Sequence, residues 1–180
     1  MTYTLIILCM IIQNPEVLIG KTLNNIEDFK EVEASEDNKI LGIRRYKSTD
    51  KLFFLNETVE QFYFNVDTNN IITEIKFSIN KIIYDPQIKV RLIETMGQPE
   101  ASFCFGEIIN SSKMTTPEGF VVSTAVGSKK KCDFYDESVL FTVWKLQDCL
   151  YLELTYPRTE ATFPRAYIRI AKSSKLLDSE

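Results

Sequence analysis

The sequence predicts an α+β fold, in which an antiparallel sheet or pair of sheets carries one or two short helices packed on one face. Three observations predict it: a period-two pattern at 62–79, a capped helical stripe at 86–96, and a succession of short apolar runs after that stripe. Of the 180 residues, 44% are hydrophobic and 26% are charged, as in ordinary globular domains. Twelve phenylalanines and eight tyrosines favour strands.

The most clearly patterned segment is a predicted hairpin. Phe62, Phe64 and Val66 alternate with other residues, and an Asp-Thr-Asn-Asn turn follows at 67–70. The second arm continues the alternation, so its odd and even positions are expected on opposite faces of the sheet. One face is predicted to carry Ile71, Thr73, Ile75, Phe77 and Ile79, and the other Ile72, Glu74, Lys76 and Ser78.

A helix is predicted at 86–96. Asp85 is a good N-cap residue, and Pro86 suits the first helical position because its missing N–H would have no partner there. Gly97 provides a left-handed position after the helix, and Pro99 blocks its continuation. The apolar stripe between these signals consists of Ile88, Leu92, Ile93 and Met96.

Shorter elements are predicted on both sides of the hairpin and the helix. Before the hairpin we expect a short helix at 22–29 and strands at 40–46 and 52–55. The strands predicted after the helix are 101–109, 120–126, 139–146, 149–156 and 163–171, with a tight reversal at 146–149. The polar stretch 127–137 is predicted to be a loop, and 172–180 a frayed tail.

These elements are predicted to form a single domain over residues 1–180. Each half offers a short helix followed by strands that pair as hairpins. Two similar helix-plus-hairpin sub-lobes, 13–82 and 83–172, are therefore an alternative organisation.

The helical segment resembles an element of known proteins. Asp85-Pro86-x-Ile88-x-x-x-Leu92-Ile93-x-x-Met96-Gly97-Gln98-Pro99 is similar to the helix followed by Leu-Gly-x-Pro in SmpA/BamE-type lipoproteins and tandem-repeat beta-lactamase-inhibitor proteins. The segment 22–29, after Gly20-Lys21, resembles the opening helix of such a unit. The resemblance implies a short helix on an antiparallel sheet and a function in protein binding.

The absence of histidine excludes several functions. Without it the chain has no Ser-His-Asp or Cys-His arrangement and no histidine-containing zinc site. The neighbouring acids Asp133, Asp136 and Glu137 are interpreted as a charged surface loop rather than an acid–base pair or a calcium site. Nucleic-acid binding is not expected, because it needs clustered basic residues. We predict no catalytic residue, no cofactor and no metal.

The four cysteines are Cys9, Cys104, Cys132 and Cys149, and they contain no Cys-x-x-Cys pair. We expect free and mostly buried thiols. The alternative is that the cysteines form disulfides, for which four cysteines allow three pairings. The three lysines before Cys132 would favour its thiolate, so a reactive cysteine is a further alternative at that position.

An acidic stretch is the candidate contact surface. Residues 27–37 hold six carboxylates and one lysine, whereas the whole chain has a net charge of only −4. Such a patch speeds encounter with a basic partner in a salt-dependent way. The predicted partner-binding residues are Glu31, Glu33, Glu36 and Asp37. The alternative is a solvated segment that only aids solubility.

The apolar run at 5–12 is too short to span a bilayer as a helix, so we predict no membrane span. It is either an ordered buried segment or an export signal. The expected location is cytoplasmic, with export to the periplasm or cell envelope as the alternative.

Together these observations predict a non-catalytic protein-binding module, such as an inhibitor or immunity protein, whose partner is another, basic protein. The first alternative is a structural or assembly protein of a bacterial-type cell envelope. The second is a histidine-free enzyme or a small-ligand binder.

Overall fold

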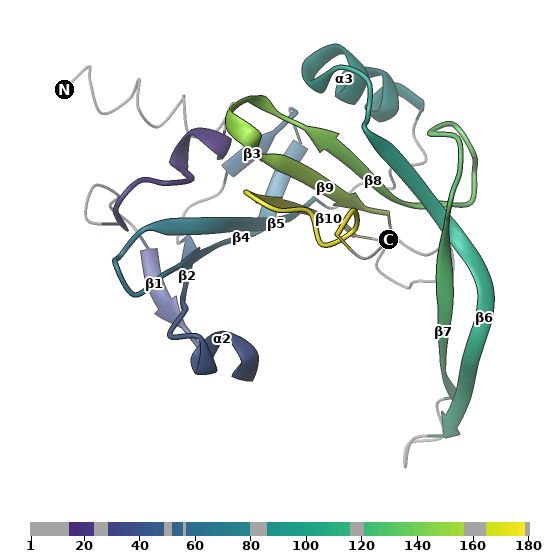
Figure 1. Cartoon of the computed structure of the whole chain (residues 1–180), viewed down its shortest axis with the longest axis horizontal. Coiled ribbons are helices and arrows are strands. Elements are labelled where there is room, and N and C mark those ends of the chain that lie inside the picture. Colours follow the sequence, from purple (N-terminus) through teal and green to yellow (C-terminus); the bar gives the residue numbers. More distant parts are fainter. Residues whose placement is uncertain are drawn as a thin grey trace.

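The computed structural model describes residues 15–23, 29–48, 52–55, 57–79, 86–115, 121–156 and 165–178. In these ranges an antiparallel sheet dominates, and two α-helices accompany it (Figure 1). The elements in chain order are η1 (Pro15–Leu18), β1 (Phe29–Val32), α2 (Glu36–Ile40), β2 (Arg44–Ser48), β3 (Leu52–Phe54), β4 (Glu57–Val66), β5 (Ile72–Ile79), α3 (Pro86–Met96), β6 (Ala101–Thr115), β7 (Val121–Lys131), β8 (Val139–Lys145), η3 (Gln147–Cys149), β9 (Tyr151–Thr155) and β10 (Ala166–Ala171).

The described strands form one sheet in the order β1-β2-β4-β5-β10-β9-β8-β6-β7, and β3 pairs with β4 outside this path. The last strand of the chain, β10, lies between β5 and β9 and is antiparallel to both. The strands of 13–82 and those of 83–172 therefore share one sheet, joined by the pairing of β5 with β10.

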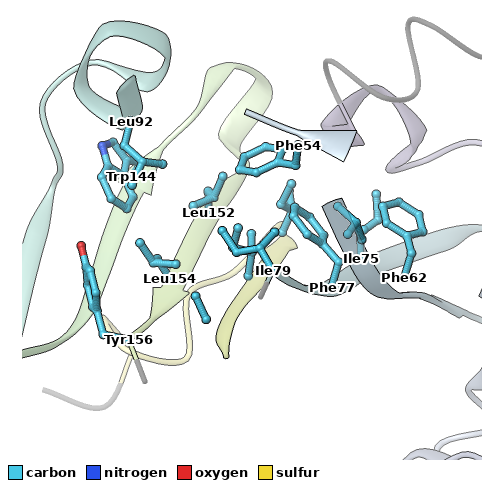
Figure 2. Packing of buried hydrophobic residues seen from close by; sticks show 14 of the residues in the cluster. Phe54, Phe62, Ile75, Phe77, Ile79, Leu92, Trp144, Leu152, Leu154 and Tyr156 are labelled. Carbon is cyan, nitrogen blue, oxygen red and sulfur yellow. The ribbon is translucent and has the colours of Figure 1, made fainter. Parts of the chain in front are cut away.

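The core lies on one face of this sheet. A row of fully buried residues in direct register crosses β4, β5, β10, β9 and β8. Figure 2 shows part of this packing, with Trp144 beside Leu92 of α3. The row consists of Phe64, Ile75, Ile170, Leu152 and Trp144.

The predicted helix is confirmed as α3 (Pro86–Met96). Gly97 has φ +78° and its N–H donates to the Ile93 carbonyl oxygen at 2.9 Å, as expected for a left-handed helix end. Leu92 is buried at 1% exposure, and the Trp144 Nε1–H donates to the Gly97 carbonyl oxygen at 3.0 Å. This bond fixes the end of α3 against the sheet. The predicted cap Asp85 lies outside the described residues.

The expectation of helices packed on one face holds for α3 and not for α2. Helix α2 has five residues, none of them buried, and Ile40 is 81% exposed. Its N-cap is Ser35, whose side chain accepts a hydrogen bond from the Asn38 N–H at 3.4 Å. The strand predicted at 40–46 consequently begins only at Arg44.

The predicted hairpin is confirmed as β4 and β5, but its face assignment is wrong at one end. The register passes from the Asn65↔Glu74 pair to the Val66↔Ile72 pair, so Thr73 is an extra residue on β5. An extra residue moves everything beyond it to the other face. Ile72 is therefore fully buried on the core face, where the alternation had predicted the opposite face.

The helix predicted at 22–29 is absent at its two end residues, although Leu23 has 3₁₀-helical backbone. Thr22 forms a bridge with Ile71, and Phe29 begins β1. Residues 24–28 lie outside the described part of the chain. The bridge supplies tertiary pairing that the local apolar spacing does not reveal.

Two segments predicted to be irregular are ordered. The first five residues of the predicted loop 127–137 belong to β7, which ends at Lys131. In the predicted tail, Ser174 is only 2% exposed, and its hydroxyl donates to Glu153 Oε1 at 2.7 Å. The sequence does not predict a strand at 127–131 because these residues have no alternating apolar pattern, and none of them is buried in the core.

Candidate functional site

The predicted acidic surface is exposed in the structure. Glu31 lies on β1, Glu33 follows it, and Glu36 and Asp37 form the first turn of α2; all four are exposed. Lys39 Nζ contacts Glu33 Oε1 at 2.9 Å and Glu36 Oε1 at 2.8 Å. The hydrogen bond and charge of Lys39 lower the pKa of Glu33.

This lysine lies just beyond the stretch 27–37 and offsets part of its negative charge. The structure therefore brings Glu33 and Glu36 together around a cation, which weakens the potential predicted for the patch. Glu27 and Asp28 lie outside the described residues. As a partner-binding surface, these residues stay a prediction.

A second candidate surface is a two-stranded ribbon made by the outer parts of β6 and β7. We define the β6–β7 ribbon as residues 106–115 and 121–128. Strand β6 pairs with β8 only as far as the Cys104↔Val139 pair, whereas its pairing with β7 continues to Thr115↔Val121. In Figure 1 these two strands extend well beyond the rest of the sheet.

Irregular pairing marks the point where the ribbon leaves the sheet. Between the Phe105↔Lys129 and Asn110↔Val126 pairs the register shifts twice, and both times the extra residue is on β6. Such bulges bend a strand and increase its twist. The ribbon consequently turns away at this point instead of continuing the line of the sheet.

Two glycines make this bend possible. A Cβ on Gly127 would lie 2.3 Å from the Phe105 ring and 2.8 Å from the Glu107 carbonyl oxygen. A Cβ on Gly106 would lie 2.3 Å from the hydroxyl of Ser128, which accepts a hydrogen bond from the Glu107 N–H at 3.0 Å. The strands approach closely here only because both positions lack side chains.

The ribbon presents apolar side chains to solvent. Every residue from 107 to 115 is exposed, so neither face of this part of β6 is covered by the rest of the described structure. The large exposed residues of the ribbon are Ile108 at 62%, Ile109 at 72%, Met114 at 63% and Val126 at 63%. Exposed apolar side chains grouped on one element are typical of an interaction surface.

A disulfide closes the base of the ribbon. Cys104 and Cys132 are bonded, with their Cα atoms 5.9 Å apart and 28 positions apart in sequence. The prediction of free thiols is therefore wrong for this pair, and so is the alternative of a reactive Cys132, because antiparallel pairing of β6 with β7 brings the two residues together. Cys149 is free and exposed, and Cys9 lies outside the described residues.

Two carboxylates of the neighbouring loop, Asp133 and Asp136, make local hydrogen bonds. Among the described residues, one group has metal-ligand spacing, namely Cys104, Cys132 and Asp136, but both sulfur atoms are already joined to each other. Asp133 accepts from the Tyr135 N–H at 2.8 Å, and Asp136 accepts from Ser138. Both carboxylates therefore close turns of the loop.

The sheet face opposite the core carries a partly buried ion network that no sequence pattern indicated. Arg169 bonds Glu74 and, at 3.0 Å, Glu153, while Lys76 Nζ lies 2.9 Å from Glu74. Burial opposes ionisation of Glu74, but the hydrogen bonds and charges of Lys76 and Arg169 outweigh it and lower the pKa of Glu74. The members come from three strands, so no sequence spacing relates them.

Comparison with known proteins assigns this chain to no family. No family model, curated protein or solved structure matches this chain, so the resemblance to SmpA/BamE-type and beta-lactamase-inhibitor proteins stays a prediction. In the described part of the chain, no helix has the length and apolar character needed to cross a membrane.

Proposed function

We propose that this protein is a non-catalytic binding module that recruits another protein through the β6–β7 ribbon. The observation that carries the proposal is the exposure of Ile108, Ile109, Met114 and Val126 on an element that projects from the sheet. A two-stranded ribbon is only marginally stable by itself in water. A partner that covers these side chains would stabilise it by burying apolar area.

The open edge of β7 indicates how a partner would bind. β7 is the last strand in the sheet order of the described residues. Its outer part, 121–128, contains no charged residue, whereas 129–131 are three lysines. Charged residues protect strand edges from pairing, so the unprotected part is the part that extends beyond the sheet. We propose that an extended segment of the partner adds to this edge.

The disulfide supports the exported alternative over the cytoplasmic one. Structural disulfides persist in oxidising compartments and are rare in the cytoplasm of mesophiles. The Cys104–Cys132 bond closes the ribbon at its base. We therefore place the proposed binding event outside the cytoplasm.

The first test of the proposed function is a comparison of two variants. The ribbon variant replaces Ile108, Ile109, Met114 and Val126 by serine. The matched control replaces Val17 and Val90 by serine; they are 49% and 48% exposed on η1 and α3, outside both candidate surfaces. A partner captured from the native cell is purified, and its dissociation constant is measured by surface plasmon resonance. The ribbon variant should bind at least tenfold more weakly, and the control should bind as the wild type does.

Two outcomes would contradict the proposal. Equal affinities of the ribbon variant and the wild type would remove the ribbon from the interface. Reversible dimerisation in sedimentation experiments, lost in the ribbon variant, would instead identify a second copy of the chain as the occupant.

The acidic surface is tested separately, by replacing Glu31, Glu33, Glu36 and Asp37 with serine or glutamine. If the partner is basic and contacts this surface, association should become slower and less dependent on salt. An unchanged association rate at low salt would leave these residues with a role in solubility only.

A further inference from the structure

The sheet face opposite the core contains a cavity of about 250 Å³. Its lining includes a row of residues in direct register across β4, β5, β10 and β9: Tyr63, Lys76, Arg169 and Glu153. Residues in direct register share a face, and the neighbouring row forms the hydrophobic core. The cavity therefore opens on the polar side, away from α3. It also lies apart from the β6–β7 ribbon, which contributes no lining residue.

The charges around the cavity do not cancel. Arg45, Lys76 and Arg169 line it, and Glu153 is the acidic residue in its wall. Glu74 adds a second carboxylate, which bonds both Lys76 and Arg169. These three cations and two carboxylates leave one unmatched positive charge, and Lys47, whose Nζ lies 5.8 Å from the centre of the Tyr63 ring, adds a second beside the cavity.

Among the described cations that line the cavity, Arg45 is the one without a carboxylate partner. In the described ranges no carboxylate pairs with its guanidinium, whose Cζ instead lies 4.0 Å from the centre of the Tyr63 ring. This stacking holds the guanidinium in place beside the cavity. Its Nε atom is buried and has no hydrogen-bond partner among the described residues. Buried polar groups are nearly always paired, so this donor calls for an acceptor.

A second unpaired group lines the same cavity. Ser78 is only 1% exposed, and its hydroxyl has no hydrogen-bond partner in the described structure. It lies on β5, two residues from Lys76 and therefore on the same face. The cavity thus offers two unsatisfied donors, a guanidinium and a hydroxyl, and two tyrosine rings in its wall, Tyr63 and Tyr167.

We propose that this cavity is a binding site for a small carboxylic acid. Its carboxylate would accept hydrogen bonds from Arg45 and Ser78, and its apolar body would pack against Tyr63 and Tyr167. One carboxylate matches the one unmatched charge among the lining residues, that of Arg45. The volume lies just below the roughly 300–1,000 Å³ of pockets for drug-sized ligands, so the ligand is small. This site is independent of the proposed function, because the two share no residue.

The test uses the full-length protein and benzoate as the probe. Benzoate is titrated at constant ionic strength while amide NMR shifts are recorded. Saturable shifts confined to β2, β4, β5, β9 and β10 are expected. Acetate, which has the carboxylate without the apolar ring, and inorganic phosphate, which has negative charge without a carboxylate, are titrated in parallel. Their binding is compared with that of benzoate.

Variants identify the donors. Arg45→Gln should weaken benzoate binding about tenfold, because a charge-assisted hydrogen bond is lost. Arg44→Gln is the matched control: it removes the same charge from the adjacent, exposed position on β2, where Arg44 contacts Asn70 and Tyr46. This control should bind as the wild type does.

Ser78→Ala separates ligand binding from a structural role. It should weaken benzoate binding severalfold while leaving the melting temperature unchanged or higher, because it removes a buried hydroxyl that has no partner. A lower melting temperature with unchanged binding would show that Ser78 is structural and would overturn its role as a donor.

Three further results would overturn the proposal. Benzoate and acetate that give no saturable shifts would exclude a carboxylate site. Phosphate that binds where benzoate does not would exclude the carboxylate as the ligand group. Equal losses in the Arg44→Gln and Arg45→Gln variants would reduce the effect to general surface charge.

Discussion

Breaking the Cys104–Cys132 disulfide should destabilise the protein strongly. The two cysteines are 28 positions apart, and a cross-link that closes a loop of this length lowers the entropy of the unfolded chain by an amount worth about 3.6 kcal/mol at 25 °C. The closed loop contains the whole β6–β7 ribbon, which contributes little burial of its own. Folding of the ribbon should therefore depend on the cross-link more than folding of the central strands does.

Equilibrium unfolding in urea measures this effect. Trp144 is fully buried in the core, so its fluorescence reports on unfolding. The wild type is unfolded with and without reductant, and a Cys104→Ala/Cys132→Ala variant is compared with a Cys149→Ala control. Reduction should lower the unfolding free energy of the wild type and of the control by about 3–4 kcal/mol, and should not change that of the double variant.

Two results would refute this reasoning. Oxidised and reduced wild type with the same unfolding free energy would show that the cross-link adds nothing. Peptide mapping without reductant that finds Cys104 and Cys132 alkylated separately would show that the bond is absent, and the sequence-based expectation of free thiols would then hold.

Substitutions at three other positions test particular contacts, each by urea unfolding. Gly97→Ala should cost about 1 kcal/mol, because φ is +78° although the added Cβ meets no atom within 4 Å; Gly97→Asn should cost less, and equal stabilities would exclude the left-handed conformation. Gly127→Ala should cost about 1–3 kcal/mol, because the new Cβ would lie 2.3 Å from Phe105; wild-type stability would contradict this close approach. Glu74→Gln should cost roughly 2 kcal/mol at pH 7. Because the pKa of Glu74 is lowered from 4.5, its contribution is present above that pH and is lost as the pH falls through the folded value, so the difference from wild type should shrink in acid; a constant difference would refute the ion network.

The sequence by itself determined the elements whose signals are local. Pro86, the apolar stripe and Gly97 define α3, since capping and helix termination depend on residues within a turn of each other. The Asp-Asn turn at 67–70 likewise defines the hairpin, because Asp67 accepts hydrogen bonds from the Asn69 and Ile71 N–H groups. The acidic residues were found because they are neighbours in sequence, and the structure leaves them exposed.

Only the tertiary structure decided which distant residues meet. The insertion of β10 beside β5 places Arg169 next to Glu74, 95 positions away, and the pairing of β6 with β7 joins Cys104 to Cys132. The alternation of apolar residues does not reveal the extra residue at Thr73 or the polar strand of the ribbon. Both features are determined by hydrogen-bonded pairing between strands, whereas the alternation reports only burial. The cavity beside Arg45 and Ser78 could not be predicted for the same physical reason: strand order is chosen by the total burial and hydrogen bonding of the whole sheet, and no local pattern encodes it.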